Sequence, residues 1–204
     1  MKKPSPQSGF TLVELLVSLA LFTVIVVAAV GSLYTVNQAA VRVNGMRTVL
    51  DNLNFATEAM SRTIRTGQNI VCGGVNNQTG IASCAVGNSN GPGKEISLES
   101  TIDAPAADGT PTKIAYRWRR DNASGNNEIQ KCVVVNNSVI EDNCVSMTAP
   151  EINIQRMDFY VNGADVGDGL QPGVMLIIQG EAHIGADELA PFSIQTFISQ
   201  RAAE

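Results

Sequence analysis

The stretch Gly9-Phe10-Thr11-Leu12-Val13-Glu14 opens a long apolar segment that continues to Val30. Of the 21 residues from Phe10 to Val30, only Glu14 has an ionisable side chain. A helix rises about 1.5 Å per residue, so this segment would span about 30 Å, the thickness of the hydrocarbon core of a bilayer. The segment is therefore predicted to cross a membrane as a helix.

A short polar leader, Met1–Ser8, precedes this segment and carries Lys2 and Lys3. A secretory signal peptide has its cleavage site after the apolar region, whereas here the small residue Gly9 stands before it. This order, together with the sequence Gly-Phe-Thr-Leu-Val-Glu, resembles the leader motif of type IV pilins and pseudopilins. The alternative is an ordinary single-pass anchor with an isolated acid near its cytoplasmic end.

The resemblance implies a role for three residues. A prepilin peptidase would cut after Gly9 on the cytoplasmic side and would N-methylate the new N-terminal residue, Phe10. Glu14 would help to align an incoming subunit with the N-terminal ammonium of its neighbour. An acid inside a membrane is costly and usually has a partner, and the helix dipole favours a negative charge in the first turn. The implied partners are the peptidase, the inner membrane, and other pilin or pseudopilin subunits that contact the N-terminal helix.

Beyond Val30, apolar residues recur in steps of three and four, which is typical of one face of an amphipathic helix. The members of this stripe are Val36, Ala40, Val43, Met46, Leu50, Leu53, Ala56, Met60 and Ile64. Arg62 and Arg65 in the last turn, with Gly67 placed for a C-terminal cap, predict that the helix ends at Thr66. One helix from Phe10 to Thr66 would be roughly 85 Å long. Its second half must pack the apolar stripe against the rest of the chain.

We therefore divide the chain into a prepilin leader (residues 1–9), a transmembrane segment (10–30), the amphipathic half of the same helix (31–66) and a globular β-rich domain (67–204). Gly31 lies where the transmembrane segment ends. Major pilins often carry a proline near this place, in a stretch that loosens when the filament forms. Gly31 is accordingly either a point of local melting or a place where another helix approaches closely.

The charge balance and the cysteines indicate which partners and which compartment the large domain has. The chain has 14 Lys+Arg against 19 Asp+Glu, and nothing in that balance predicts a nucleic-acid partner, which would need clustered basic residues. The positive-inside rule keeps the leader lysines in the cytoplasm, which places the large domain on the oxidising side of the membrane. The cysteines are Cys72, Cys84, Cys132 and Cys144, two pairs with equal twelve-residue offsets.

Equal offsets favour local bridges within each cysteine pair, although four cysteines allow three connectivities. A zinc site is the rival interpretation. The sequence has one histidine and lacks a C-x₂₋₄-C spacing, so it gives little support to zinc.

The remainder of the chain predicts six or seven mostly antiparallel strands. Together with the long helix they give an α+β architecture of the pilin-like kind that the resemblance implies. Strands are expected at Asn69–Cys72, Glu95–Glu99, Lys113–Arg119, Ile129–Val135, Ile152–Val161, Val174–Ile178 and Phe192–Ser199, with a short hairpin arm at Val139–Ile140. The stretch Asp121–Asn127 is interpreted as a hairpin loop.

The layout of the last third of the chain adds to the resemblance. A strand ending near Phe159, a Gly/Asp-rich turn, the run Gln171-Pro172-Gly173-Val174, a strand to Gly180 and a terminal strand follow one another. This series resembles the larger minor pilins, which include the W-type pilus subunits and the J-type pseudopilin of type II secretion.

Few residues suggest catalysis or metal binding. The single histidine, His183, lies at a strand end, and no G-x-S-x-G elbow supplies a nucleophile for it, so we interpret it as solvated or structural. Asp165 and Asp168 stand among glycines and are candidates for a calcium loop, as are Asp121 and its polar neighbours. Neither stretch has EF-hand spacing, and acidic Gly-rich turns are usually only turns. No cofactor is expected.

Trp118 lies between Arg117 and Arg119, a combination that can stack on nucleic-acid bases. On a strand, however, Tyr116 and Trp118 share one face and the two arginines share the other. We therefore expect the aromatic face to pack in the core.

These features predict a non-enzymatic minor pilin, a structural subunit of a bacterial type IV pilus-like filament that takes part in pilus assembly or its initiation. It would first lie in the inner membrane as a single-pass protein with its globular domain outside the cytoplasm. The alternatives are a pseudopilin in the periplasmic tip complex of a type II secretion system, and a membrane-anchored binding domain or enzyme.

Overall fold

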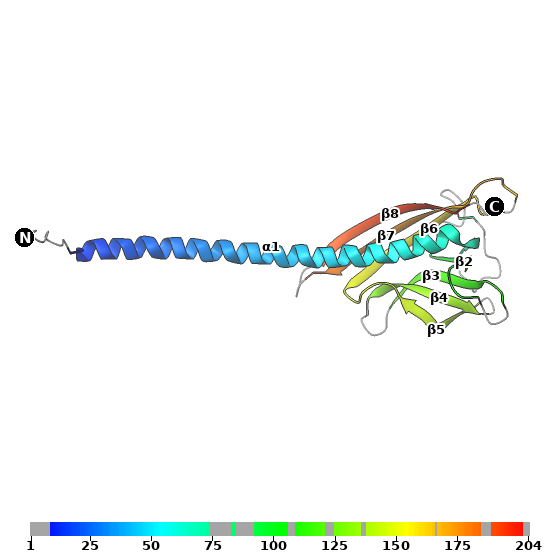
Figure 1. Cartoon of the computed structure of the whole chain (residues 1–204), viewed down its shortest axis with the longest axis horizontal. Coiled ribbons are helices and arrows are strands. Elements are labelled where there is room, and N and C mark those ends of the chain that lie inside the picture. The colour runs from blue at the N-terminus through cyan, green and yellow to red at the C-terminus, as the bar shows by residue number, and fades with distance from the viewer. Residues whose placement is uncertain are drawn as a thin grey trace, which may run out of the picture. The chain divides into compact units, whose positions relative to one another are not determined.

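The computed structural model describes residues 9–73, 83–84, 92–105, 109–120, 125–135, 138–165, 167–184 and 189–201. One helix, α1 (Leu12–Thr66), precedes eight strands in this part of the chain (Figure 1). They are β1 (Gln68–Cys72), β2 (Glu95–Ser100), β3 (Thr112–Arg120), β4 (Asn127–Val135), β5 (Ser138–Ser146), β6 (Ile152–Asn162), β7 (Gly173–His183) and β8 (Leu189–Ser199). Residues 1–44 and 45–204 form two compact units, and α1 contributes to both.

The strands form two antiparallel sheets, which confirms the α+β, pilin-like architecture. The first sheet has the order β1-β2-β3-β4-β5 and the second has the order β6-β7-β8. The described strands number eight, so the expectation of six or seven was too low. The main difference is the arm expected at Val139–Ile140, which is part of the nine-residue strand β5. Its polar stretch Glu141-Asp142-Asn143 concealed the strand, and β5 tolerates these residues because it lies at a sheet edge.

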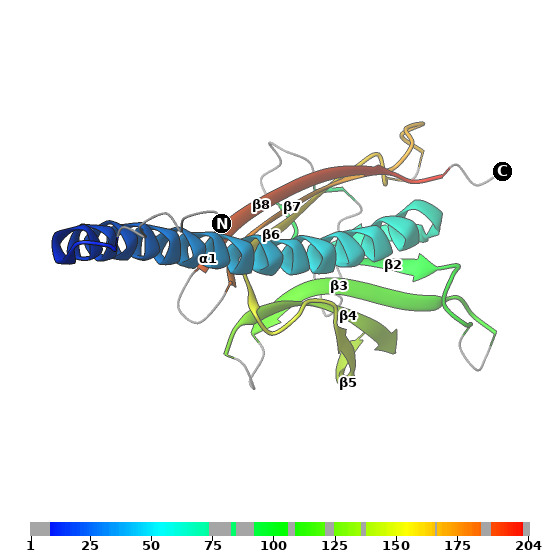
Figure 2. The same cartoon turned by 60° about the vertical axis from the view of Figure 1, so that its left-hand side comes forward.

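The last turns of α1 pack against both sheets, as both views of the fold show (Figures 1 and 2). The buried face of the helix consists of Val49, Leu53, Ala56, Met60, Thr63 and Ile64. In the same core cluster lie Ile96 and Leu98 of β2, Phe159 of β6 and Leu176 of β7. Each fully buried aliphatic or aromatic side chain of this kind contributes about 1.5–3 kcal/mol. The helix therefore forms the centre of a single core shared by the two sheets.

The predicted buried stripe is correct from Leu53 onward. It is wrong for Val36, Ala40 and Val43, which are exposed, and it is wrong one turn before Leu53. Leu50 is 42% exposed, whereas Val49 is 5% exposed and belongs to the core. A period of 3.6 residues allows steps of either three or four, so the sequence Met46 to Leu53 fits a stripe through Val49 as well as one through Leu50. Packing against the sheets decides between them.

The C-terminal end of α1 is closed by residues that adjoin β2 and β8, and not by the predicted glycine cap. Gly67 does not adopt the left-handed conformation that such a cap requires. A Cβ at this position would lie 2.1 Å from Leu98 Cδ1 and 2.8 Å from the carbonyl oxygen of Thr63, so glycine is needed here for close approach.

Three donors satisfy the last carbonyl groups of the helix. The amide of Gly67 donates to the carbonyl of Thr63 (2.8 Å), and the amide of Arg201 donates to the carbonyl of Arg65 (2.7 Å). The hydroxyl of Thr101 donates to the carbonyl of Thr66 (3.0 Å). Two of these three donors, Arg201 and Thr101, thus lie far from the helix end in the sequence.

Both local disulfides that the cysteine spacing favours are present. Cys72–Cys84 has a Cα–Cα distance of 5.9 Å and Cys132–Cys144 one of 4.0 Å. The first bridge joins the two sheets, because Cys72 ends β1 while the amide of Cys84 donates to Val161 of β6 (2.9 Å). Gly93 forms an antiparallel bridge with Phe159 beside it, so the outer edge of β6 is paired as well.

Asp158 of β6 is a buried acid at this junction between the sheets. Its side chain has no exposed surface and binds Lys94, which precedes β2, and Arg156 of its own strand. Burial alone raises the pKa of Asp158, but hydrogen bonds and Coulombic attraction from Lys94 and Arg156 outweigh it, so the pKa lies below its ordinary value. The charged form of Asp158 therefore stabilises the fold.

This pKa shift predicts a pH-dependent loss of stability for Asp158→Asn. Because the folded-state pKa lies below the unfolded value, the stabilisation is complete above about pH 4 and is lost as the pH falls through the folded-state pKa. At pH 7 the substitution should cost about 2 kcal/mol, the usual value for losing hydrogen bonds to a charged group. Thermal unfolding of the full chain in detergent measures this, with the exposed Asp165→Asn as the control.

Comparing the two variants distinguishes the effect of losing the buried charge of Asp158 from the effect of losing any acidic charge. Asp165→Asn should leave the unfolding temperature nearly unchanged at every pH. If Asp158→Asn were as stable as the wild type at pH 7, or if the difference did not shrink in acid, this interpretation of the ion pairs would be wrong.

Candidate functional site

The sequence places the principal candidate site at the start of α1. Gly9 and Phe10 lie just before the helix and are exposed, Phe10 to 80%. The peptide bond between them therefore lies in an accessible, non-helical segment. Residues 1–8 of the predicted leader, with Lys2 and Lys3, lie outside the described residues.

Thr11 forms the N-terminal cap of α1. Its hydroxyl accepts a hydrogen bond from the amide of Glu14 (3.3 Å), and its carbonyl accepts one from the amide of Leu15 (3.2 Å). The run Thr11-Leu12-Val13-Glu14 has the T-x-x-E spacing of a capping box, which is a local sequence signal for a helix start. The helix therefore starts at Leu12 and not at the predicted Phe10. Thr11 is a site residue that was missed.

Glu14 lies in the first turn of α1, where the helix dipole favours its charge. Within the part of the chain that the structure describes, no side chain donates a hydrogen bond to its carboxylate. The nearby hydroxyl groups are bound to backbone carbonyls of the helix. The hydroxyl of Ser18 donates to the carbonyl oxygen of Glu14 (2.7 Å), and that of Thr23 donates to the carbonyl oxygen of Ala20 (2.8 Å). Among the described residues, the carboxylate of Glu14 is thus a polar side-chain group of this segment that is left for a partner.

The apolar residues after Glu14 are exposed on all sides of the helix. An 18-residue window of α1 has a mean hydropathy of 2.7, and none of it is buried. From Leu15 to Val30, every large apolar side chain except Val26 is more than half exposed. A helix that is apolar all round is stable in lipid or among other apolar helices. These features are consistent with membrane anchoring through α1.

The comparisons with known proteins agree with this geometry. Residues 4–30 match the family model described as the prokaryotic N-terminal methylation motif, which is the signature of type IV pilin-like proteins. The match covers Gly9, Phe10 and Glu14 together with the apolar start of α1. No curated protein and no solved structure matches the chain.

The candidate calcium loop is a turn built by Asp168. The carboxylate of Asp168 accepts a hydrogen bond from the amide of Leu170 (2.8 Å). The backbone amide of Asp168 donates to the carbonyl of Asp165 (3.4 Å). Gly163, Gly167 and Gly169 around it adopt positive φ angles. Among the described residues, no three His, Cys, Asp or Glu side chains gather as a metal site.

The second candidate loop lies partly outside the described residues, which lack Asp121 and Asn122. Asn126 donates to the carbonyl of Pro150 (2.7 Å), and Glu128 accepts a hydrogen bond from Gln130 (2.6 Å). The polar groups of this stretch that can be placed are thus occupied by the fold.

His183 is the last residue of β7 and is exposed. Its amide donates to the carbonyl of Glu151 (2.9 Å), and its side chain borders a pocket of about 220 Å³ beside α1. The other lining residues include Asn52, Val49 and Ile184, and none of the residues that line the pocket is a serine or a cysteine.

The aromatic face of β3 packs inward, as predicted. Tyr116 is fully buried, and its hydroxyl donates to Thr63 of α1 (3.0 Å). Burial raises the pKa of Tyr116 to about 12, so the phenol is neutral at physiological pH. Trp118 is partly buried against the core.

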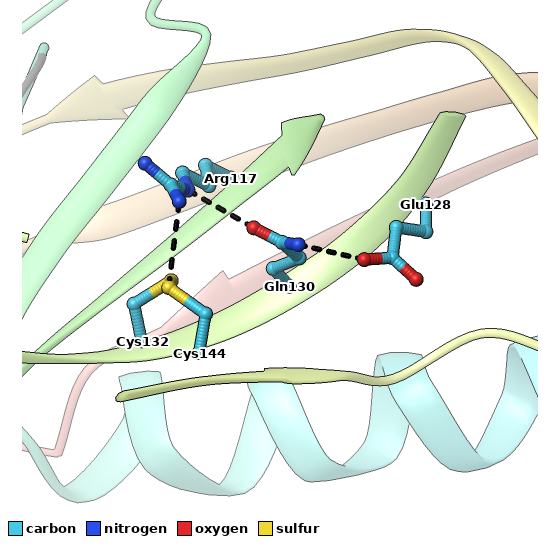
Figure 3. The surroundings of a disulfide bond; sticks show 5 residues. All are labelled: Arg117, Glu128, Gln130, Cys132 and Cys144. Carbon is cyan, nitrogen blue, oxygen red and sulfur yellow. Dashed lines mark hydrogen bonds between the residues drawn. A yellow bond between two sulfur atoms is a disulfide. The ribbon is translucent and has the colours of Figure 1, made fainter. Parts of the chain in front are cut away.

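Arg117, on the opposite face of β3, contacts the second disulfide. Its guanidinium donates to Cys144 Sγ (3.4 Å) and to Gln130 of β4 (3.2 Å) (Figure 3). Gln130 in turn donates to Glu128 (2.6 Å). Arg117 therefore holds the β3–β4–β5 hairpins together and is not free to stack on a ligand.

The cap predicts that Thr11→Ala frays the first turn of α1. Loss of an N-cap hydroxyl costs about 1 kcal/mol, which corresponds to about fivefold faster local opening. Amide hydrogen exchange of the full chain in detergent should show this acceleration at Glu14. Thr23→Ala is the control, because the hydroxyl of Thr23 binds a carbonyl within the helix. Equal exchange rates at Glu14 in wild type and Thr11→Ala would show that Thr11 does not cap the helix.

Proposed function

We propose that this chain is a minor pilin, a structural subunit of a type IV pilus-like filament that acts in pilus assembly or its initiation. The observation that carries the proposal is the order of an exposed Gly9–Phe10 bond, a capped helix start and Glu14 within the matched methylation motif. The layout of β6, β7 and β8 supports the larger minor pilins within this class. The work of the chain is packing among subunits and not catalysis.

Processing is the first step of the proposed function. The prepilin peptidase cuts after Gly9 on the cytoplasmic face and methylates Phe10. The cap supports this order of events, because Thr11 binds Glu14 through its own side chain and remains in the mature chain. The helix start is therefore the same before and after the cut. The chain is then held in the inner membrane by α1, with residues 45–204 outside the cytoplasm.

Assembly is the second step. The carboxylate of Glu14 lies four residues from the new N-terminus in an otherwise apolar segment. Two opposite charges attract much more strongly in a low dielectric than in water, and an unpaired charge there is penalised by several kcal/mol. An incoming subunit whose N-terminal ammonium reaches Glu14 satisfies both charges. The ion pair therefore attracts the incoming subunit and also fixes its position along the helical bundle.

Two alternatives remain to be tested against this proposal. A pseudopilin of a type II secretion tip complex shares the same motif and strand layout. Its genes would lie beside those of a secretion system, and immunogold labelling would not place it on sheared pili. A membrane-anchored enzyme or binding domain would show hydrolase activity or calcium binding in the purified chain.

The processing step predicts that Gly9→Val blocks cleavage. A branched side chain at this position replaces the small residue of the motif, so the chain should keep residues 1–9 and remain outside filaments. Intact-mass measurement of membrane protein checks this. Gly31→Ala is the matched control, since a Cβ at Gly31 meets no atom within 4 Å. Mature filaments that contain Met1 would contradict the proposal.

The assembly step predicts that Glu14→Gln leaves insertion and cleavage intact but reduces recruitment. Glutamine keeps the size of the side chain and removes the charge that pairs with the ammonium. We expect about a tenfold reduction of the variant in sheared-filament blots, relative to its level in the membrane. Asp51→Asn is the control, because Asp51 is an exposed acid on the part of α1 that belongs to the second unit. Wild-type incorporation of Glu14→Gln would remove this residue from the mechanism.

A further inference from the structure

Strand β8 is an edge strand of the second sheet, and only one of its two sides is paired among the described strands. It pairs with β7 along its whole length, from His183↔Leu189 to Gly173↔Ser199. In the described part of the chain, no backbone group outside this ladder bonds residues 189–199. The other edge of this sheet, β6, is bound by Gly93 and Cys84. Figures 1 and 2 both show β8 as the outermost strand of its sheet.

The register shows which backbone groups of β8 point away from β7. The amide of Gln200 donates to the carbonyl of Pro172 (2.9 Å), so residues 200 and 172 form a hydrogen-bonded pair. Such pairs alternate along an antiparallel ladder, and the β7–β8 register is continuous. The even-numbered residues of β8 therefore bond β7. The amides and carbonyls of Ser193, Gln195, Phe197 and Ser199 face the free edge.

This edge carries little protection against strand pairing. The sequence Leu189–Ser199 contains no charged residue, whereas the edge strand β5 carries Glu141 and Asp142. Natural edge strands are usually blunted by charges, bulges or proline. Pro191 lacks an amide at the free edge, and it lies near one end of the strand. The remaining odd-numbered residues present an uninterrupted row of donors and acceptors.

A groove runs between this strand and α1. It has a volume of about 510 Å³ and is lined by Thr196 of β8 and by Asn54, Phe55, Thr57, Glu58 and Ser61 of α1. Phe55 is 72% exposed, the largest exposed fraction among the large apolar side chains that the structure describes in the second unit. The only charge in the lining, Glu58, is paired with Arg62. The groove thus offers an aromatic wall next to an open hydrogen-bonding edge.

We propose that β8 and this groove take an extended, uncharged segment of a different polypeptide, which adds to the sheet as an antiparallel strand. The main-chain groups of residues 193–199 would bind the backbone of the segment, and alternate side chains would lie against Phe55. An uncharged segment fits because a charge placed over Phe55 would lose solvent without gaining an ion pair.

Antiparallel pairing with the β8 strand of a second copy of this chain does not satisfy the same edge. Within the second unit, β8 runs parallel to α1: Ala190 pairs with Ala182 near the Ile184 that contacts Gly45, and Arg201 binds Arg65. Antiparallel pairing of two β8 strands would therefore place the two helices antiparallel. Helices anchored in one membrane or filament run in one direction. This step rests on the proposed function.

The test uses the full chain in its own cell envelope with a photoreactive probe, p-benzoylphenylalanine, in place of Phe55. We expect a cross-link to a different polypeptide, within a segment that lacks Lys, Arg, Asp and Glu. Gln195→Pro removes a free-edge amide without touching the β7 ladder, and should lower the cross-linked product about tenfold. Gln195→Thr is the matched control and should retain it, since it keeps the amide.

A second test, in which the probe is moved and the groove wall is changed, does not depend on the folding of the proline variant. With the probe at Ser61, Phe55→Asp adds a charge to the groove wall on an exposed helix position and should also lower the product about tenfold. A product that survives Gln195→Pro and Phe55→Asp, a cross-link to a second copy, or no cross-link at all would overturn the proposal. Cleavage between Gly9 and Phe10 is measured in the same samples, so a failure of the proposed function is seen separately.

Discussion

The packing of one helix face against two sheets is the interaction on which the second unit depends. The β6–β8 sheet and the β1–β5 sheet each have an inner apolar face, and Leu53, Met60 and Ile64 of α1 fill the space they share. Neither sheet has a second layer of helices among the described residues, so each face would be exposed without α1. Further links between the same two sheets include the Cys72–Cys84 bridge and the ion pair of Asp158 with Lys94. The second half of the helix is therefore a core element, while its first half has no core of its own.

The sequence predicts the parts of the fold that depend on local signals, and it does not predict the parts that depend on contacts between distant residues. An apolar run of membrane length and a stripe with helical period are local signals, so the helix and its end at Thr66 follow from the sequence. Equal cysteine offsets favour the local bridges for the same reason. The choice between Val49 and Leu50, the division of the strands into two sheets and the role of Gly67 depend on contacts between distant residues. Local patterns do not contain that information.

The same distinction applies to the candidate site. Gly9, Phe10 and Glu14 could be named from the sequence because a short motif carries them. Thr11 could have been named too, since a T-x-x-E spacing is a local signal for a helix start. The free edge of β8 could not, because which strand lies outermost is a property of the assembled sheet. Asp158 was hidden for a similar reason, as its partner Lys94 is 64 residues away in the sequence.

The binding of the last described residues to the end of α1 has a mechanical consequence. Within the second unit, a pulling force along residues 45–66 of α1 acts parallel to β8. The carbonyl of Arg65 is held by Arg201 and that of Gly67 by the side chain of Gln200, so strand and helix are tied at their far ends. Such a load acts in shear on the buried helix face and on these ties, which must yield together and not one after another. A load along this part of the helix is thus shared between the buried helix face and the two ties.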